Sequence, residues 1–262
     1  MWFLLVVVAL LGLAIGSFLN VVIYRVPQGQ SLVAPASHCP HCGAGVRNRH
    51  NVPVLGWLVL RGRCADCGAP ISPRYPLVEA LAAAAFVLVT WRLDDLDRLA
   101  GLPAWLYWTS IAIALAAIDL DCHRLPNAIV LPSYPVLAVL LVAPALWQQD
   151  YWPLLRAAIG AVALFGGYFA LALAYPKGMG FGDVKLAGLI GAMLGWLSYS
   201  ALLVGAFAAF LLGGLAGIVV IASRRGTGKT PLPFGPFMIT AVAVALFAAQ
   251  PLADSYLRLT GL

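Results

Sequence analysis

Residues 2–24 read WFLLVVVALLGLAIGSFLNVVIY, an apolar stretch without a charged side chain. A helix needs about 20 mainly apolar residues to cross the hydrocarbon core of a bilayer. The stretch is longer than the apolar part of a secretory signal and lacks a clear small-residue cleavage site, so we expect it to remain as a membrane helix. This stretch therefore predicts the fold class, an all-α membrane protein.

The same pattern recurs along the chain. Of the 262 residues, 62% are hydrophobic and 10% are charged, whereas soluble domains are about 25% charged. Seven more apolar stretches follow the first, at 77–91, 104–120, 128–147, 154–175, 184–199, 201–222 and 234–250. The sequence therefore predicts an all-α polytopic membrane protein with about eight transmembrane helices and a small domain between the first two.

The distribution of Lys and Arg predicts the orientation. If the loop after the first helix is cytoplasmic, that side holds twelve of the sixteen basic residues. We therefore expect a multi-pass protein of the cytoplasmic membrane, with both termini outside the cytoplasm. The net charge of +6 is then explained by the excess of Lys and Arg in the cytoplasmic loops. We expect contact with anionic membrane lipid and no binding of nucleic acid.

Two C-x-x-C pairs lie in the loop after the first helix. Cys39 and Cys42 are separated from Cys64 and Cys67 by twenty-one residues, which is the spacing of a zinc ribbon. Four thiolates complete a tetrahedron around zinc and leave no open position, so the predicted site is structural. Two disulfides and an iron–sulfur cluster are the alternatives, and the reducing cytoplasm disfavours the disulfides.

Two aspartates occupy unusual positions. Asp119 ends the apolar run WLYWTSIAIALAAID, and Asp183 closes the glycine-rich turn KGMGFGDVK before the next apolar stretch. A charged side chain at the bilayer centre costs about 2.5–3.5 kcal/mol on insertion scales. Asp183 could be a helix N-cap, and Asp119 could mark a helix end at the interface, where a carboxylate is disfavoured. Gly180 and Gly182 lack Cβ atoms beside Asp183, which would let a substrate backbone approach.

Paired carboxylates would support peptide hydrolysis. Two of them about 4 Å apart would repel by about 4 kcal/mol at an effective dielectric constant of about 20, so one would keep a proton while the other stayed ionised. Such a pair can activate water and polarise a carbonyl, which makes Asp119 and Asp183 candidate catalytic residues. Two other functions stay open: a proton- or ion-coupled transporter that uses these aspartates, and a scaffold that docks a cytoplasmic partner.

Five motifs in order resemble the type IV prepilin peptidases, intramembrane aspartic proteases of bacterial inner membranes. They are GSFLNVVIYRVP (16–27), the two C-x-x-C pairs, RYPLVE (74–79), IDLDCHRLPN (118–127) and GMGFGDVK (178–185). The resemblance implies an enzyme that cleaves the basic leader from prepilins or pseudopilins at the cytoplasmic face. Members commonly methylate the new N-terminus with S-adenosylmethionine.

The resemblance also implies roles for parts of this chain. The catalytic pair would be Asp119 and Asp183, with Asp121 in reserve. For the methyl donor, it points to the first cytoplasmic loop, with Arg74 and Glu79 as candidate residues. The expected division is a first transmembrane helix at 1–24, a zinc-binding and methyltransferase part at 25–76, and a peptidase part at 77–262.

The run SRRGTGKT (223–230) is similar to a phosphate-binding loop. Ser223 stands where the first glycine of that motif belongs, and Pro231 blocks ordinary continuation into the helix that would hold phosphate. We therefore expect no nucleotide site at 223–230.

Overall fold

The computed structural model describes residues 1–176, 178–223 and 232–260. Over these ranges the chain is mainly helical, and its only extended pairings are two isolated bridges. It divides into two compact units, Met1–Ala114 and Leu115–Leu262. The boundary between them falls inside α4 (Leu102–Cys122).

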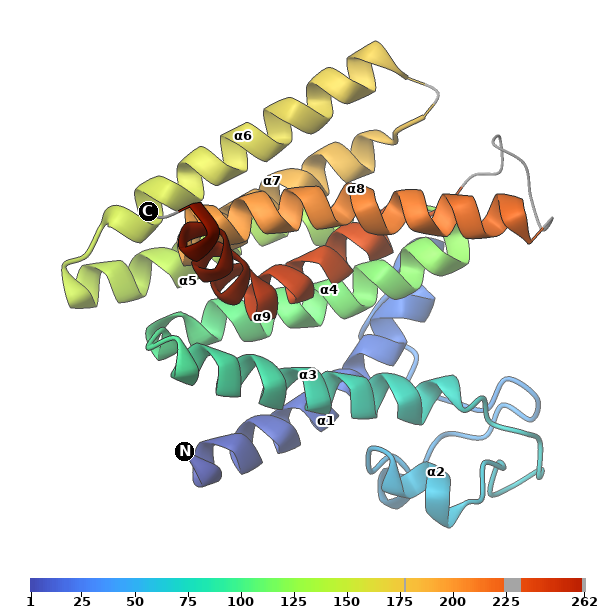
Figure 1. Ribbon diagram of the computed structural model, residues 1–262. Coiled ribbons are helices and arrows are strands. Elements are labelled where there is room, and N and C mark those ends of the chain that lie inside the picture. Colours follow the sequence, from blue (N-terminus) through green and yellow to red (C-terminus); the bar gives the residue numbers. More distant parts are fainter. Residues whose placement is uncertain (177, 224–231, 261–262) are drawn as a thin grey trace. The chain divides into compact units, whose positions relative to one another are not determined.

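The long helices follow the predicted apolar stretches. They are α1 (Trp2–Arg25), α3 (Arg74–Asp95), α4, α5 (Asn127–Gln148), α6 (Trp152–Ala174), α7 (Phe181–Leu197), α8 (Tyr199–Ala222) and α9 (Gly235–Thr260) (Figure 1). The short helices are η1 (Val26–Gln28), η2 (Asn48–His50), α2 (Leu55–Val59) and η3 (Leu99–Gly101).

The predicted fold class is confirmed. Within the described ranges, seven helices are long and apolar enough to cross a membrane. The remaining predicted stretch, 184–199, corresponds to α7, which has 17 residues and is buried along most of its length. The described ranges thus contain seven candidate membrane spans where the sequence predicted about eight, and α7 is a shorter, enclosed helix.

In the first unit, α1 packs closely against α3 (Figure 1). A Cβ atom on Gly12 would lie 2.6 Å from the Cα of Ala83, and one on Gly16 would lie 2.6 Å from the Cα of Glu79. Small residues four positions apart allow membrane helices to approach this closely. The two glycines therefore set the distance between α1 and α3.

Two charged side chains attach the loop between α1 and α3 to these helices. Arg25 is buried at the end of α1 and donates to the carbonyl oxygens of Ser31, at 2.9 Å, and Pro35, at 2.6 Å. Glu79 is buried near the start of α3, and its Oε2 accepts a hydrogen bond from the Val54 backbone N–H at 2.6 Å. Val54 has a φ of 61°, which is unfavourable for a β-branched residue. Glu79 therefore helps to hold a strained turn.

In the second unit, α7 packs against α5, α6, α8 and α9. A Cβ atom on Gly160 of α6 would lie 2.2 Å from the carbonyl oxygen of Gly191, so the backbones of α6 and α7 approach very closely. On another side of α7, the Tyr134 hydroxyl donates to the carbonyl oxygen of Lys185 at 2.6 Å. The first contact lies at the middle of α7, and the second lies near its beginning, two residues after Asp183.

Candidate active site and metal centre

Asp119 is buried at the end of α4, with 4% of its surface exposed. Its Oδ2 accepts a hydrogen bond from the backbone N–H of Gly235, at the start of α9, over 3.0 Å. The helix ends at Cys122, and the next residue, His123, has a φ of 52°. A buried carboxylate is costly without such a donor, so the position of Asp119 depends on a residue from a distant helix.

Asp183 is half-buried in the first turn of α7. Its Oδ2 accepts a hydrogen bond from the backbone N–H of Gly180 at 3.2 Å. The alternative prediction that Asp183 is itself the N-cap of this helix is wrong. Gly180 is the N-cap, and Asp183 is the third residue of the helix. The carboxylate still supports the start of the helix, as the third residue of a capping box does.

The structure brings Asp119 and Asp183 together in the second unit. Each aspartate has a glycine beside it: Gly235 donates a hydrogen bond to Asp119, and Gly182 directly precedes Asp183. Leu125 connects their surroundings, because its side chain lies 3.1 Å from the position of a Cβ atom on Gly182 and 3.3 Å from that of one on Gly235. The surroundings of Asp119, in α4, and of Asp183, in α7, therefore meet at the side chain of Leu125.

Burial distinguishes Asp119 from Asp121. Asp121 lies two residues further along α4 and is exposed, whereas Asp119 is enclosed. Because residues two apart on a helix point to different faces, the two cannot occupy the same place beside Asp183. The geometry favours Asp119.

Gly180 and Gly182 border the Asp183 carboxylate, as the sequence indicates. A Cβ atom on Gly180 would lie 3.4 Å from Asp183 Oδ2, and one on Gly182 would lie 3.1 Å from the Cβ of Leu125. Side chains at positions 180 and 182 would therefore occupy space next to the Asp183 carboxylate and Leu125. Entry of a substrate along these glycines stays a prediction.

Sequence reasoning did not identify some contacts near this pair. It missed Gly235, and it missed the hydrogen bond from Lys185 Nζ to Asn127 Oδ1, at 2.9 Å. A signal for Gly235 was present, since Pro236 follows it and proline is favoured in the first turn of a helix. That signal marks a helix start, but it does not indicate which side chain the helix start meets.

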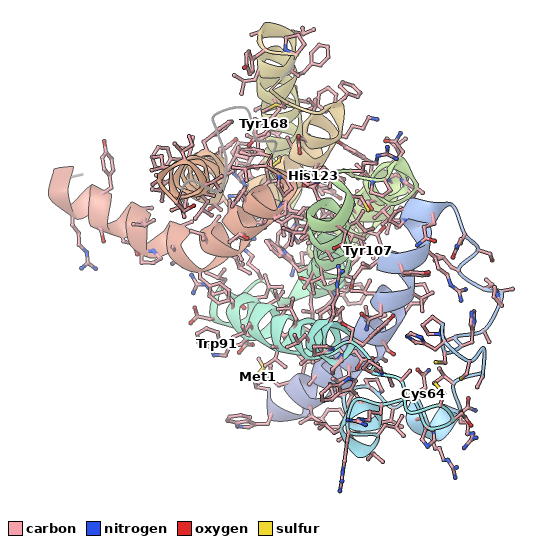
Figure 2. The ribbon with its side chains drawn as sticks, turned by 90° about the vertical axis from the view of Figure 1, so that its right-hand side faces the viewer. Met1, Cys64, Trp91, Tyr107, His123 and Tyr168 are labelled. Atoms are coloured by element: carbon pink, nitrogen blue, oxygen red, sulfur yellow. The ribbon has the colours of Figure 1, made fainter. Side chains whose placement is uncertain are left out.

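The four cysteines lie on two matched knuckles in the loop that also carries α2; Cys64 is labelled in Figure 2. In each knuckle the N–H of the first cysteine donates to the carbonyl oxygen five residues later, and its own carbonyl oxygen accepts from the glycine four residues later. Those glycines, Gly43 and Gly68, have φ values of 71° and 70°. Glycine adopts this left-handed conformation without strain.

The sulfur atoms form a compact cluster suited to a metal. The Sγ atoms of Cys39, Cys42, Cys64 and Cys67 all lie within 4.8 Å of one another, and those of Cys39 and Cys67 are 3.8 Å apart. A tetrahedral ion with metal–sulfur bonds of about 2.3 Å needs sulfur atoms about 3.8 Å apart. All four are free cysteines, and the described loop therefore contains no disulfide in this cluster.

The surroundings favour thiolate at Cys39 and the neutral thiol at Cys67, where burial and the neighbouring thiols raise the pKa to about 12. Hydrogen bonds from the backbone of Cys42 and His41 lower the pKa of the Cys39 thiol to about 6. A thiolate is the form that binds metal. The ion pair of Arg47 with Asp66, at 2.6 Å, also links the two knuckles.

The two candidate residues for the methyl donor differ in surroundings. Arg74 is exposed at the start of α3, whereas Glu79 is buried and receives the Val54 N–H. Glu79 thus has a structural contact in the loop, and a role of either residue in cofactor binding stays a prediction. Residues 224–230 of the run resembling a phosphate-binding loop lie outside the described residues.

We expect Glu79→Ala to loosen the loop, because it leaves the Val54 N–H without its acceptor. The loss of such a partly buried hydrogen bond costs about 1–3 kcal/mol. Limited proteolysis should then cut the segment 47–60 faster than in the wild type. Glu79→Gln retains an acceptor oxygen and is the matched control, expected to resist cutting nearly as well as the wild type. Equal resistance of Glu79→Ala would argue against this role.

Two regions of the chain match known protein families. The bacterial peptidase A24 N-terminal domain matches residues 10–93, and the type IV leader peptidase family matches residues 105–222. The second match includes both Asp119 and Asp183. No solved structure matches the chain.

Several relatives carry the name prepilin leader peptidase/N-methyltransferase. The one from Aeromonas hydrophila is 37% identical over 98% of this chain and 94% of its own length. The one from Stutzerimonas stutzeri is 35% identical over 95% of this chain and 92% of its own. The one from Klebsiella pneumoniae is 40% identical over 71% of this chain and 82% of its own.

Proposed function

The chain belongs to the type IV leader peptidase family, and we propose that it removes the leader peptide from prepilins or pseudopilins and methylates the new N-terminus. Relatives that it matches over more than nine tenths of their length are named for both activities. Both matched regions are present, one on each side of the segment 94–104. The enzyme is therefore a peptidase with methyltransferase activity.

The pairing of Asp119 with Asp183 carries the peptidase proposal. In a poorly hydrated site two neighbouring carboxylates do not both remain charged, so they share one proton. The ionised carboxylate takes a proton from a water molecule, whose oxygen attacks the scissile carbonyl carbon. The protonated carboxyl polarises that carbonyl and then supplies a proton to the leaving amine. Gly180 and Gly182 would let an extended substrate backbone pass beside Asp183.

We assign the sulfur cluster of Cys39, Cys42, Cys64 and Cys67 to structural zinc. Four sulfur ligands in tetrahedral spacing are typical of zinc or iron–sulfur sites, and a closed set of four leaves no position for a reacting group. Zinc would hold the two knuckles together in a loop with little apolar core of its own. It takes no part in the proposed cleavage step.

S-adenosylmethionine would supply the methyl group. We place its site in the first unit, and we retain Arg74 as the candidate contact because its side chain is exposed at the start of α3. Glu79 would act indirectly, since its carboxylate already holds the Val54 turn. Glu79 is thus proposed to shape the loop that receives the methyl donor.

The protein is a multi-pass membrane protein of the bacterial inner membrane. We propose that the cysteine loop and the carboxylate pair face the cytoplasm and that both termini lie outside it, in contact with membrane lipid and without nucleic acid. This orientation requires α7 to count as the eighth crossing. Its 17 residues give a helix about 26 Å long, close to the roughly 30 Å of a hydrocarbon core.

A processing assay tests this function. The purified protein in detergent would be mixed with a prepilin, with and without S-adenosylmethionine, and the products measured by mass spectrometry. We expect loss of the leader in both reactions and an added methyl group only when the methyl donor is present. An intact prepilin under both conditions, together with proton or ion flux through reconstituted protein, would instead support the transporter hypothesis.

A further inference from the structure

The beginning of α9 meets the Asp119 carboxylate. Gly235 is buried there, and its N–H donates to Asp119 Oδ2 at 3.0 Å. A Cβ atom on Gly235 would lie 2.7 Å from the same oxygen, closer than carbon and oxygen atoms approach without displacement. The site thus uses both properties of this residue: its amide as a donor and its missing side chain as space.

The helix geometry explains why this amide is available. The first N–H groups of a helix have no partner inside the helix, and they carry the positive end of its dipole. Gly235 is the first residue of α9. Its N–H can therefore serve a carboxylate from α4 without breaking a hydrogen bond of α9.

Aromatic packing holds Gly235 in place. The ring of the preceding residue, Phe234, packs against Tyr168 and Phe210, with ring centroids 6.3 and 5.7 Å apart, and Tyr168 and Phe210 are themselves 5.3 Å apart. The cluster of Tyr168, Phe210 and Phe234 therefore holds the residue directly before Gly235 and restricts movement of the Gly235 amide.

We propose that Gly235 is a positioning residue for cleavage: its amide fixes the orientation of the Asp119 carboxylate beside Asp183. This inference rests on the proposed function, because it assigns a role within the same site. The matched family region ends at residue 222, before Gly235. Displacement of a catalytic group by about 1 Å can reduce a rate by about a hundredfold, so the precise placement of one carboxylate matters.

Three variants test the proposal. Gly235→Ala keeps the N–H and adds a Cβ atom, whereas Gly235→Pro adds a ring and removes the N–H. Gly214→Ala in α8 is the matched control, because a Cβ atom there would have no neighbour within 4 Å. For each variant kcat and KM for prepilin cleavage would be measured over a range of pH, together with thermal unfolding.

We expect Gly214→Ala to behave like the wild type. Gly235→Ala should lower kcat by about tenfold and Gly235→Pro by about a hundredfold or more, with little change in KM, because the contact is to the catalytic group and not to the substrate. The pH dependence of kcat should also change in Gly235→Pro, since a hydrogen bond to a carboxylate affects its protonation. A purely structural role would not alter the pH dependence.

A folded Gly235→Ala variant with wild-type kcat would overturn the inference, even if Gly235→Pro fails to fold. A loss confined to KM would also overturn it, because it would indicate a role in binding the substrate. If the wild-type protein itself leaves prepilin uncut, the proposed function fails. That result is distinct from normal cleavage by both Gly235 variants, which would contradict only the positioning role.

Discussion

We expect Asp119→Asn and Asp183→Asn each to abolish prepilin cleavage, while methyl transfer to an already cleaved pilin should continue. Asparagine can neither ionise nor hold the proton that the two carboxyl groups share. General acid–base catalysis contributes about 10²–10⁴-fold to a rate, and we expect each change to lose at least that much. Since such residues act as a unit, the double variant should be no slower than either single variant. Initial rates of leader removal measure all three.

Asp121→Asn is the matched control for this prediction. It makes the same chemical change two residues away on α4, at an exposed side chain, so most of the cleavage activity should persist. Asp183→Asn also keeps an acceptor oxygen for the Gly180 N–H. A loss of cleavage in this variant would therefore not result from unfolding of the first turn of α7. Full cleavage by Asp183→Asn would count decisively against the aspartic protease mechanism.

A variant with Cys39→Ser and Cys64→Ser should lose the metal that we propose for the cysteine cluster. We expect about one equivalent of zinc per wild-type chain and almost none in the double variant, because each knuckle has lost a thiolate. The binding free energy of structural zinc is about 10–16 kcal/mol in small peptides and is also folding free energy. The loop between α1 and α3 should therefore become sensitive to protease. Metal analysis and limited proteolysis measure these two effects, while cleavage of prepilin should largely persist.

Cys122→Ser provides the control for the cysteine variant. Cys122 is an exposed free cysteine at the end of α4 and does not belong to the cluster of four. Its replacement should leave the zinc content at the wild-type value. A wild-type protein without metal, whose mass corresponds to two disulfides, would refute the zinc assignment.

Local sequence patterns determined most of the fold. The apolar stretches predict the helices because burial in lipid requires a long run of apolar residues with all backbone groups bonded within the helix. The cysteine spacing predicts the two knuckles, since each depends on only a few neighbouring residues. Asp119 and Asp183 stand out for the same reason, as acidic residues at the ends of apolar runs.

Only the tertiary structure decided which groups meet. Sequence spacing alone does not distinguish Asp119 from Asp121, whereas packing buries the first and exposes the second. Packing also brings the Gly235 amide to Asp119 and the Glu79 carboxylate to the Val54 turn. Such contacts join residues far apart in the chain. No pattern within a single helix contains that information, because the partner lies on another helix or loop.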